Sequence, residues 1–216
     1  QQVIGTSAYT MLDDHLYLEA GAYHSVPNDW LDHLAGTSLD SPRPHNLIPY
    51  WRAEYQMTRG LHYASAGVFG LSADLQPDGS INGSNGYVDY GTDATYQYSG
   101  DVHAINAHAT YIREDQHLRQ SLLAGEATSV SNQLNTLKLD AAYTWNQTWT
   151  ASAGWFDIEG SSDTLAYEPN PVDGSLNGSP DSRGYTVQVQ YAPWGKKNGS
   201  IRDTAMNAQI GVEYTG

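Results

Sequence analysis

The chain has 216 residues, with 24 Asp and Glu against 10 Lys and Arg, a formal charge of −14 at pH 7, and no cysteine. The lack of cysteine excludes a disulfide framework, a thiolate metal site, a cysteine nucleophile and a c-type haem attached to this chain. The acidic balance argues against a nucleic-acid partner, and a mean hydropathy of −0.53 with no long apolar run excludes a helical membrane span.

Uncharged polar residues, glycine and tyrosine fill the chain. Charged residues make up only 16%, and 16 Tyr and 6 Trp accompany 2 Phe and 21 Gly. This composition disfavours helical bundles and favours β structure with polar loops. No G-x-S-x-G nucleophile elbow occurs, so we identify no catalytic residues and expect that the protein is not an enzyme.

Period-2 alternation of apolar and polar residues predicts ten strands. In 49–57, for example, Trp51 and Tyr55 face one way and Arg52 faces the other. In chain order the predicted strands are 3–11, 16–23, 49–57, 62–72, 87–98, 103–111, 137–145, 149–156, 185–191 and 206–214.

Short and long connections alternate along the chain. The short set comprises 12–14, 58–61, 99–101, 146–148 and the somewhat longer 193–204, and the long loops are 24–48, 73–86, 114–136 and 160–184. In an up-and-down antiparallel sheet all tight turns then lie at one end. That asymmetry is typical of an outer-membrane barrel, so we predict an all-β fold, a single transmembrane β-barrel domain over 1–216.

The two faces of the predicted strands differ in a way that fits this barrel. One face carries Ala, Gly, Tyr and Trp, as expected for a lipid-facing band with aromatic girdles. A soluble β-sandwich or soluble barrel is the alternative, and it would pack Val, Ile, Leu and Phe into a core. The aromatic residues expected at the membrane interfaces are Tyr9, Tyr23, Trp51, Tyr98, Tyr111, Trp145, Trp149, Tyr191 and Tyr214.

The other face would line the lumen. Among its ionisable residues, six acids against two bases give a charge of −4, which favours cations. Arg52 and Lys138 could instead pair with acids on adjacent strands and form a salt-bridge ladder that plugs the barrel. The predicted lumen-lining residues are Glu19, Arg52, Glu54, Asp89, Asp93, His108, Lys138, Asp140 and Glu213.

Histidines suggest no metal site. His24, His33 and His45 lie in one long loop at spacings of nine and twelve, which match no tight ligand motif. His103 and His108 are five residues apart on one strand and therefore face opposite ways. We predict no metal and no cofactor on this chain.

Five segments in this order resemble a proteobacterial family of outer-membrane β-barrels labelled as cytochrome c proteins. They are Ile48–Tyr55, Tyr87–Gln97, Ala109–Gln116, Gly178–Tyr185 and Tyr191–Lys196. Many members of that family carry a CxxCH haem-attachment segment ahead of the barrel. The resemblance implies a bacterial outer-membrane location and the barrel part of a porin–cytochrome conduit for electron transfer.

The chain departs from the family pattern at both ends. It has no CxxCH, so haem c is implied only on a segment that this sequence does not contain, and no residue here is assigned to it. Relatives have strands before the first strand and after Tyr214, so we expect part of a larger barrel, because unpaired edges are not tolerated in lipid.

Three functions follow from these patterns. The first is the barrel of an electron-transfer conduit, with outer-membrane lipid, a c-type cytochrome and further copies of the chain as candidate partners. The second is a plain cation-selective diffusion porin. The third is a soluble or surface β protein for carbohydrate binding or adhesion, since Tyr and Trp can stack on sugars.

Overall fold

The computed structural model describes residues 3–25, 43–44, 46–77, 83–167, 177–192 and 210–215. These residues form one sheet of eleven strands and one short helix, α2 (Arg119–Ala124). The strands are β1 (Val3–Leu12), β2 (Leu16–Ser25), β3 (Arg43–Pro44), β4 (Ile48–Arg59), β5 (His62–Gln76), β6 (Asn85–Ser99), β7 (His103–His117), β8 (Ser131–Trp145), β9 (Trp149–Gly160), β10 (Ser182–Tyr191) and β11 (Ile210–Thr215).

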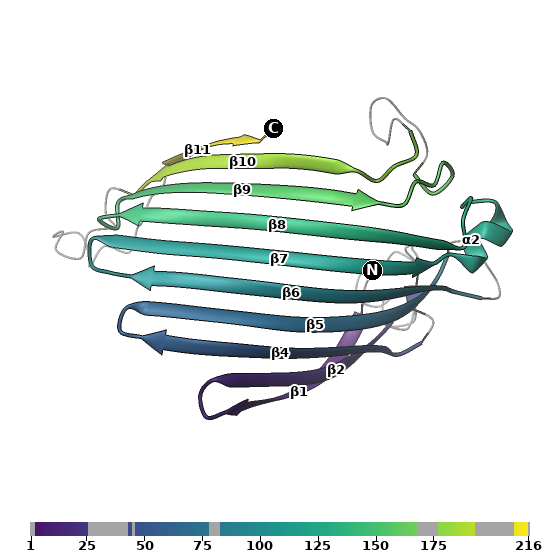
Figure 1. Ribbon diagram of the computed structural model, residues 1–216, viewed down its shortest axis with the longest axis horizontal. Helices are drawn as coiled ribbons and strands as arrows, with labels where there is room; N and C mark the ends of the chain where they lie inside the picture. The colour runs from purple at the N-terminus through teal and green to yellow at the C-terminus, as the bar shows by residue number, and fades with distance from the viewer. Residues whose placement is uncertain are drawn as a thin grey trace, which may run out of the picture.

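The sheet is antiparallel and follows an up-and-down order, as the sequence predicts. Each long strand pairs with the next one along the chain, and the two-residue β3 pairs with the far end of β5 (Figure 1). All ten predicted strands are represented, although residues 206–209 of the last one lie outside the described residues. The sheet is not closed, because β1 pairs only with β2 and β11 pairs only with β10.

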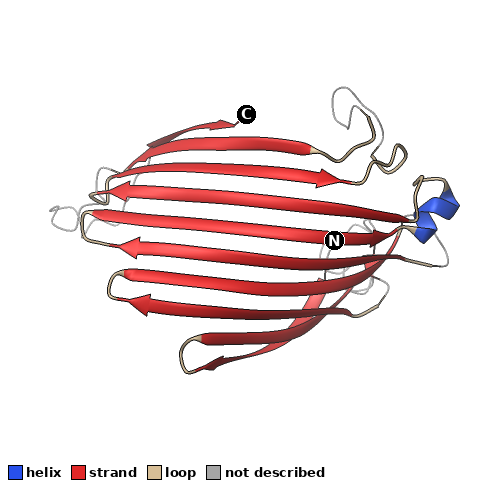
Figure 2. Cartoon of the chain, viewed as in Figure 1, coloured by secondary structure: helices blue, strands red, loops and turns tan. Residues whose placement is uncertain are grey.

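The sheet curves strongly. On a flat sheet β1 and β7, which are five strand spacings apart, would lie about 24 Å from each other. Val3 of β1 and Glu114 of β7 nevertheless line the same cavity. Figures 1 and 2 show β1 and β2 curling behind the other strands. The concave side is therefore the face that carries Glu114.

Tight turns gather at one end of the sheet and long connections at the other, as predicted (Figure 1). The residues between β1 and β2 and between β8 and β9 include two consecutive positive-φ residues, Asp13 with Asp14 and Asn146 with Gln147. Consecutive positive φ values are the geometry of tight hairpin turns that match the twist of the strands. Gly60, at φ 60°, makes the turn between β4 and β5.

The strands extend further toward the long-connection end than the alternation predicted. β7 reaches His117 and β8 begins at Ser131, so the loop predicted as 114–136 is a connection of 118–130. Polar residues occupy both faces there, as Glu114 and Asp115 do on β7, and they hide the strand from an apolar–polar pattern. Here β5, β6, β7 and β8 have 15 residues each.

Helix α2, which the sequence did not predict, lies in this connection. The side chain of Asn85 on β6 caps it, since Asn85 Oδ1 accepts hydrogen bonds from the backbone N–H groups of Gln120 at 2.9 Å and Ser121 at 3.3 Å. The described residues contain no helix with the length and apolar character needed to cross a bilayer.

Very few apolar side chains are buried. In the described residues the buried hydrophobic side chains are Ile48, Ala73, Leu118 and Ala127. Leu118 and Ala127 belong to the connection around α2, and Ile48 and Ala73 lie near the same end of β4 and β5. A core between two packed layers, which the soluble sandwich would require, is not present in the described part of the chain.

Candidate functional site

The concave side, here called the polar face, collects the residues predicted to line a lumen. Residues directly opposite each other in neighbouring strands share a face, and the register links Glu19 to Arg52 and Asp93 to Lys138 through Thr110. The predicted set lies on this face: Glu19 on β2, Arg52 and Glu54 on β4, Asp89 and Asp93 on β6, His108 on β7, Lys138 and Asp140 on β8, and the backbone position of Glu213 on β11.

Arg52 is the centre of an ion cluster on the polar face. Its Nη1 and Nη2 donate to the two carboxylate oxygens of Asp93 at 2.6 and 2.9 Å, and its Nε donates to Glu54 Oε2 at 3.1 Å. The side chains are 21%, 9% and 16% exposed for Arg52, Asp93 and Glu54. Such a two-point contact fixes the guanidinium in one orientation.

The ion pair between Arg52 and Asp93 spans β5, the strand between them, at a glycine of that strand. Arg52 lies on β4 and Asp93 on β6, and Gly67 of β5 stands directly opposite Asp93. A Cβ at Gly67 would lie 3.1 Å from both Arg52 Nη2 and Asp93 Oδ1. Phe69, the next residue of β5 on this face, lies below the guanidinium, whose carbon is 5.8 Å from the ring centroid.

Asp89 and Glu114 form a second acidic group that has no described basic partner. They stand opposite each other on β6 and β7, and neither forms an ion pair with a described lysine or arginine. Glu114 was missed by the sequence analysis because the predicted strand ended at Tyr111. The alternation of His108, Thr110, Ile112 and Glu114 on one face could have found it.

The remaining predicted residues are more open. His108 Nδ1 lies 3.4 Å from Asp140 Oδ1, with side chains 43% and 64% exposed. Lys138 forms no ion pair with other described residues, so the predicted ladder is limited to the Arg52 cluster and this histidine contact. The side chain of Glu213 lies outside the described residues.

The described residues contain no candidate metal site. No group of three or more His, Cys, Asp or Glu side chains lies close enough to hold an ion there. His33 and His45 lie outside the described residues. The polar face is therefore an acid-rich surface with one neutralised guanidinium, and what it offers chemically is attraction for positive charge.

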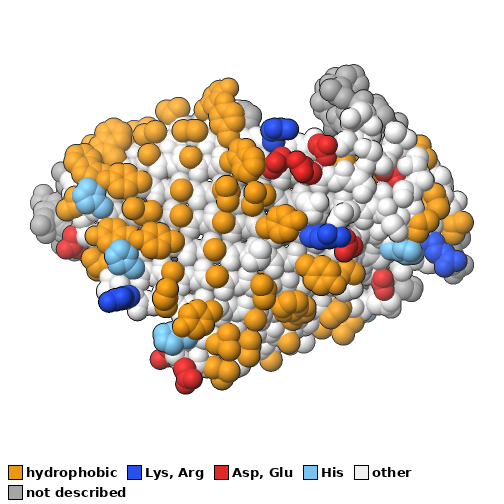
Figure 3. Space-filling model, in the orientation of Figure 1, with side chains coloured by type: hydrophobic (Ala, Val, Ile, Leu, Met, Phe, Trp, Pro, Cys, Tyr) orange, Lys and Arg blue, Asp and Glu red, His pale blue; other side chains and the backbone are white. Residues whose placement is uncertain are grey.

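The convex side, here called the apolar face, carries exposed hydrophobic side chains over most of its area (Figure 3). Trp149 is 45% exposed and Val189 is 48% exposed, and none of the described residues forms a second layer over them. Two rows of aromatic residues bound the area. The row near the tight turns contains Tyr55, Tyr96, Tyr98, Tyr143, Trp145, Trp149 and Tyr191, and the row near the long connections contains Trp51, Tyr90, Tyr111, Trp155, Tyr185 and Tyr214.

Charged residues on the described part of the apolar face lie at its two ends, for example at Arg59 beside the tight turn after β4 and near or past the second row on β7, β9 and β10. Arg113 and Asp115 continue β7 beyond Tyr111 and contact each other at 3.1 Å. Asp157 follows Trp155 on β9, and Arg183 precedes Tyr185 on β10. The change from aromatic to charged residues falls at the same register position on β9 and β10, where Asp157 stands opposite Arg183, and two residues further along on β7.

The prediction of a place at the membrane interface was wrong for two of the aromatic residues, which lie on the polar face. Tyr9 stands opposite Glu19 and therefore lies on the polar face, where its ring is 5.9 Å from that of Tyr17. Tyr23 is four residues from Glu19 on the same strand and shares that face, with its ring 6.3 Å from that of Tyr50. A residue's closeness to the end of a strand does not determine which face it lies on. Its odd or even position along the strand does.

Comparisons with models of protein families, with curated proteins and with solved structures find no match to this chain, so its likeness to the cytochrome-labelled barrels stays a prediction.

Proposed function

We propose that the chain forms the wall of an outer-membrane β-barrel whose polar face lines a water-filled passage that favours cations. The observation that carries the proposal is the exposed apolar band between two aromatic rows. Monomeric soluble proteins rarely expose a continuous apolar surface of this extent, whereas barrels in lipid require one.

The height of the band agrees with this proposal. Trp149 and Trp155 mark its limits on β9, and Tyr98 and Tyr90 mark them on β6. Separations of six and eight residues correspond to about 20–27 Å along the strands. A strand tilt of about 40° reduces this length to about 15–21 Å across the membrane, which approaches the roughly 25 Å apolar band of outer-membrane barrels.

The acid-rich polar face supports the cation preference. Acidic side chains outnumber Arg52 and Lys138 on the described part of this face, and Arg52 is already neutralised by Asp93 and Glu54. A wet passage lined in this way concentrates cations and repels anions. In lipid both edge strands, β1 and β11, need hydrogen-bonding partners for the wall to close.

Reversal potentials measured on the intact protein in planar bilayers test the proposal. Under a KCl gradient we expect cation selectivity, because the passage is acidic. Asp140→Asn should reduce the selectivity, since Asp140 is exposed on the polar face. Asp157→Asn removes the same charge from the apolar face and should leave it unchanged. Anion selectivity, or a chain that stays folded and monomeric in buffer without detergent, would contradict the proposal and favour the soluble reading.

The electron-transfer role rests on the family resemblance alone. A passage of this kind could surround a haem-bearing partner, and the described residues themselves contain no cysteine for covalent attachment. A pyridine haemochrome spectrum of the intact protein and its co-purifying partners tests this role. If neither contains covalent haem, the plain cation-selective porin remains.

A further inference from the structure

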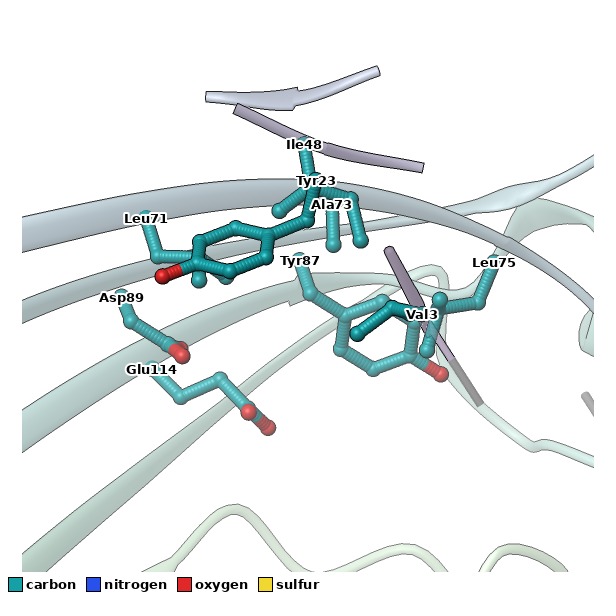
Figure 4. Close-up of a pocket in the computed structure, with 9 residues that line it drawn as sticks. All are labelled: Val3, Tyr23, Ile48, Leu71, Ala73, Leu75, Tyr87, Asp89 and Glu114. Carbon is teal, nitrogen blue, oxygen red and sulfur yellow. The ribbon is translucent and has the colours of Figure 1, made fainter. Parts of the chain in front are cut away.

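The polar face holds a cavity of about 460 Å³ near the long-connection end of the sheet. Its walls come from six strands, β1 to β7 with β3 excepted, which the curvature of the sheet brings together (Figure 4). A volume of this size accommodates a small organic molecule. The apolar wall of the cavity consists of Val3, Ile48, Leu71, Ala73 and Leu75.

One end of the cavity is strongly acidic. Figure 4 shows Asp89 and Glu114 projecting side by side from β6 and β7, with the rings of Tyr23 and Tyr87 nearby. Directly opposed like charges destabilise a sheet. Asp89 Oδ1 is buried and accepts no hydrogen bond from the described residues, whereas Glu114 Oε1 accepts one from the side-chain amide of Gln116 at 2.5 Å.

No described basic residue neutralises this pair. The guanidinium of Arg52 is occupied by Asp93 and Glu54 further along the polar face. Two carboxylates that face an apolar wall without a cation are costly to keep ionised. A positive charge that entered the cavity would offset this cost.

The chemistry of the lining selects among positively charged ligands. A calcium ion needs six to eight oxygen ligands, whereas this cavity presents two carboxylates, two tyrosines and otherwise hydrocarbon. A ligand with its own hydrocarbon body would bury apolar surface against the wall. Tyrosine rings also attract ammonium groups through their electron-rich faces.

We propose that this cavity binds a small organic cation, with an ammonium group beside Asp89 and Glu114 and a hydrocarbon body against the apolar wall. The ammonium donates charge-assisted hydrogen bonds to the two carboxylates. The site deepens the proposed function by naming a class of solute, and it rests on that function for the route by which the solute reaches the cavity.

Calorimetric titration of the intact protein in detergent at pH 7.5 tests the site with three probes of one shape. Phenethylamine is the cation, 2-phenylethanol the neutral analogue and phenylacetate the anion. We expect saturable binding of phenethylamine and at least tenfold weaker binding of the other two. Equal affinity for the alcohol, or no binding of the amine, overturns the proposal; in the latter case the two acids share a proton instead.

Variants separate the acidic end from the rest of the molecule. Asp89→Asn with Glu114→Gln should weaken the binding of phenethylamine at least tenfold and leave the binding of 2-phenylethanol unchanged. This double variant removes a like-charge contact, so it is expected to fold. Asp157→Asn, which removes an acid from the apolar face, is the control for a loss of charge outside the cavity and should leave the binding of both probes unchanged. Unchanged amine binding in the double variant refutes the site.

Two further measurements keep this inference distinct from the proposed function. Calcium that binds to the same two acids and displaces the amine would show a metal site, which overturns the organic-cation assignment. Cation-selective conductance without amine binding refutes the cavity proposal alone. Amine binding by a protein that never inserts into lipid supports the cavity and refutes the barrel.

Discussion

Asp163 ties together the two connections at the long-connection end. It is 1% exposed, and its carboxylate accepts hydrogen bonds from the backbone N–H groups of Thr128, Ser129, Leu165 and Ala166 and from the side chain of Asn132. Burial alone would raise the pKa of Asp163, but these donors outweigh burial and hold the pKa well below its usual range.

Replacing Asp163 should destabilise this end of the molecule. Asp163→Ala leaves several buried N–H groups without an acceptor, which should lower the free energy of unfolding by about 2–3 kcal/mol. Asp163→Asn keeps one acceptor oxygen and should lower the free energy of unfolding by less. Urea titration followed by tryptophan fluorescence measures both. Glu126→Ala, at an exposed position of the same connection, is the control and should stay within about 0.5 kcal/mol of the parent.

The same carboxylate predicts an acid dependence. Because the folded pKa of Asp163 lies below its ordinary value, its stabilisation is complete above that ordinary value, about 4, and is lost as the pH falls through the folded pKa. The difference in Tm between the parent and Asp163→Ala should therefore shrink below about pH 4. A difference that stays constant down to pH 2 would contradict the role of the ionised carboxylate.

Gly67 decides whether the Arg52 cluster can form. In Gly67→Val the new side chain would displace the guanidinium from Asp93, since a Cβ alone already reaches 3.1 Å from both groups. We expect a loss of about 1–3 kcal/mol in the free energy of unfolding. Gly154→Val is the matched control, because a Cβ there meets only one atom, at 3.9 Å. Equal stability of the two variants would argue against the cluster.

Successive residues of each strand alternate between the polar face and the apolar face, so two neighbouring residues of β10 can be compared directly. Val189→Arg places a charge in the middle of the exposed apolar band and should cost about 2–4 kcal/mol in lipid vesicles. Gln188→Arg puts the same side chain on the polar face and should cost far less. The comparison uses urea unfolding in vesicles. Similar costs for the two variants would show that the apolar face does not meet lipid.

Alternation was sufficient to predict where most strands lie and which way most residues face. It failed where both faces are polar, as at Glu114 and Asp115, because no apolar signal remains to mark a strand. It also missed α2, whose six residues are held by Asn85 from a distant strand.

At the scale of the site, the polar face was predictable but its pairing was not. The Arg52 contact with Asp93 depends on β4, β5 and β6 lying in one register, with Gly67 between the charges. Sequence separation of 41 residues hides such a contact. Likewise, the cavity beside Asp89 exists only because the sheet bends β1 toward β7.

The whole molecule is asymmetric along its strands. Strands of 15 residues are longer than the 9–11 residues that a tilted strand needs to cross a bilayer. In the proposed barrel the excess lies on the side of the long connections, where Arg113 and Asp157 face outward. The wall would therefore rise above the lipid as a collar that is wet on both sides.

This collar changes where a solute would first be held. Asp89 precedes Tyr90, a member of the aromatic row near the long connections, and Glu114 follows Arg113, which stands directly opposite Tyr90. A cation captured between the two acids would wait at the entrance, at or above the level of the lipid surface. Capture and crossing then become separate steps, because the two acids hold the cation at the entrance before it enters the passage.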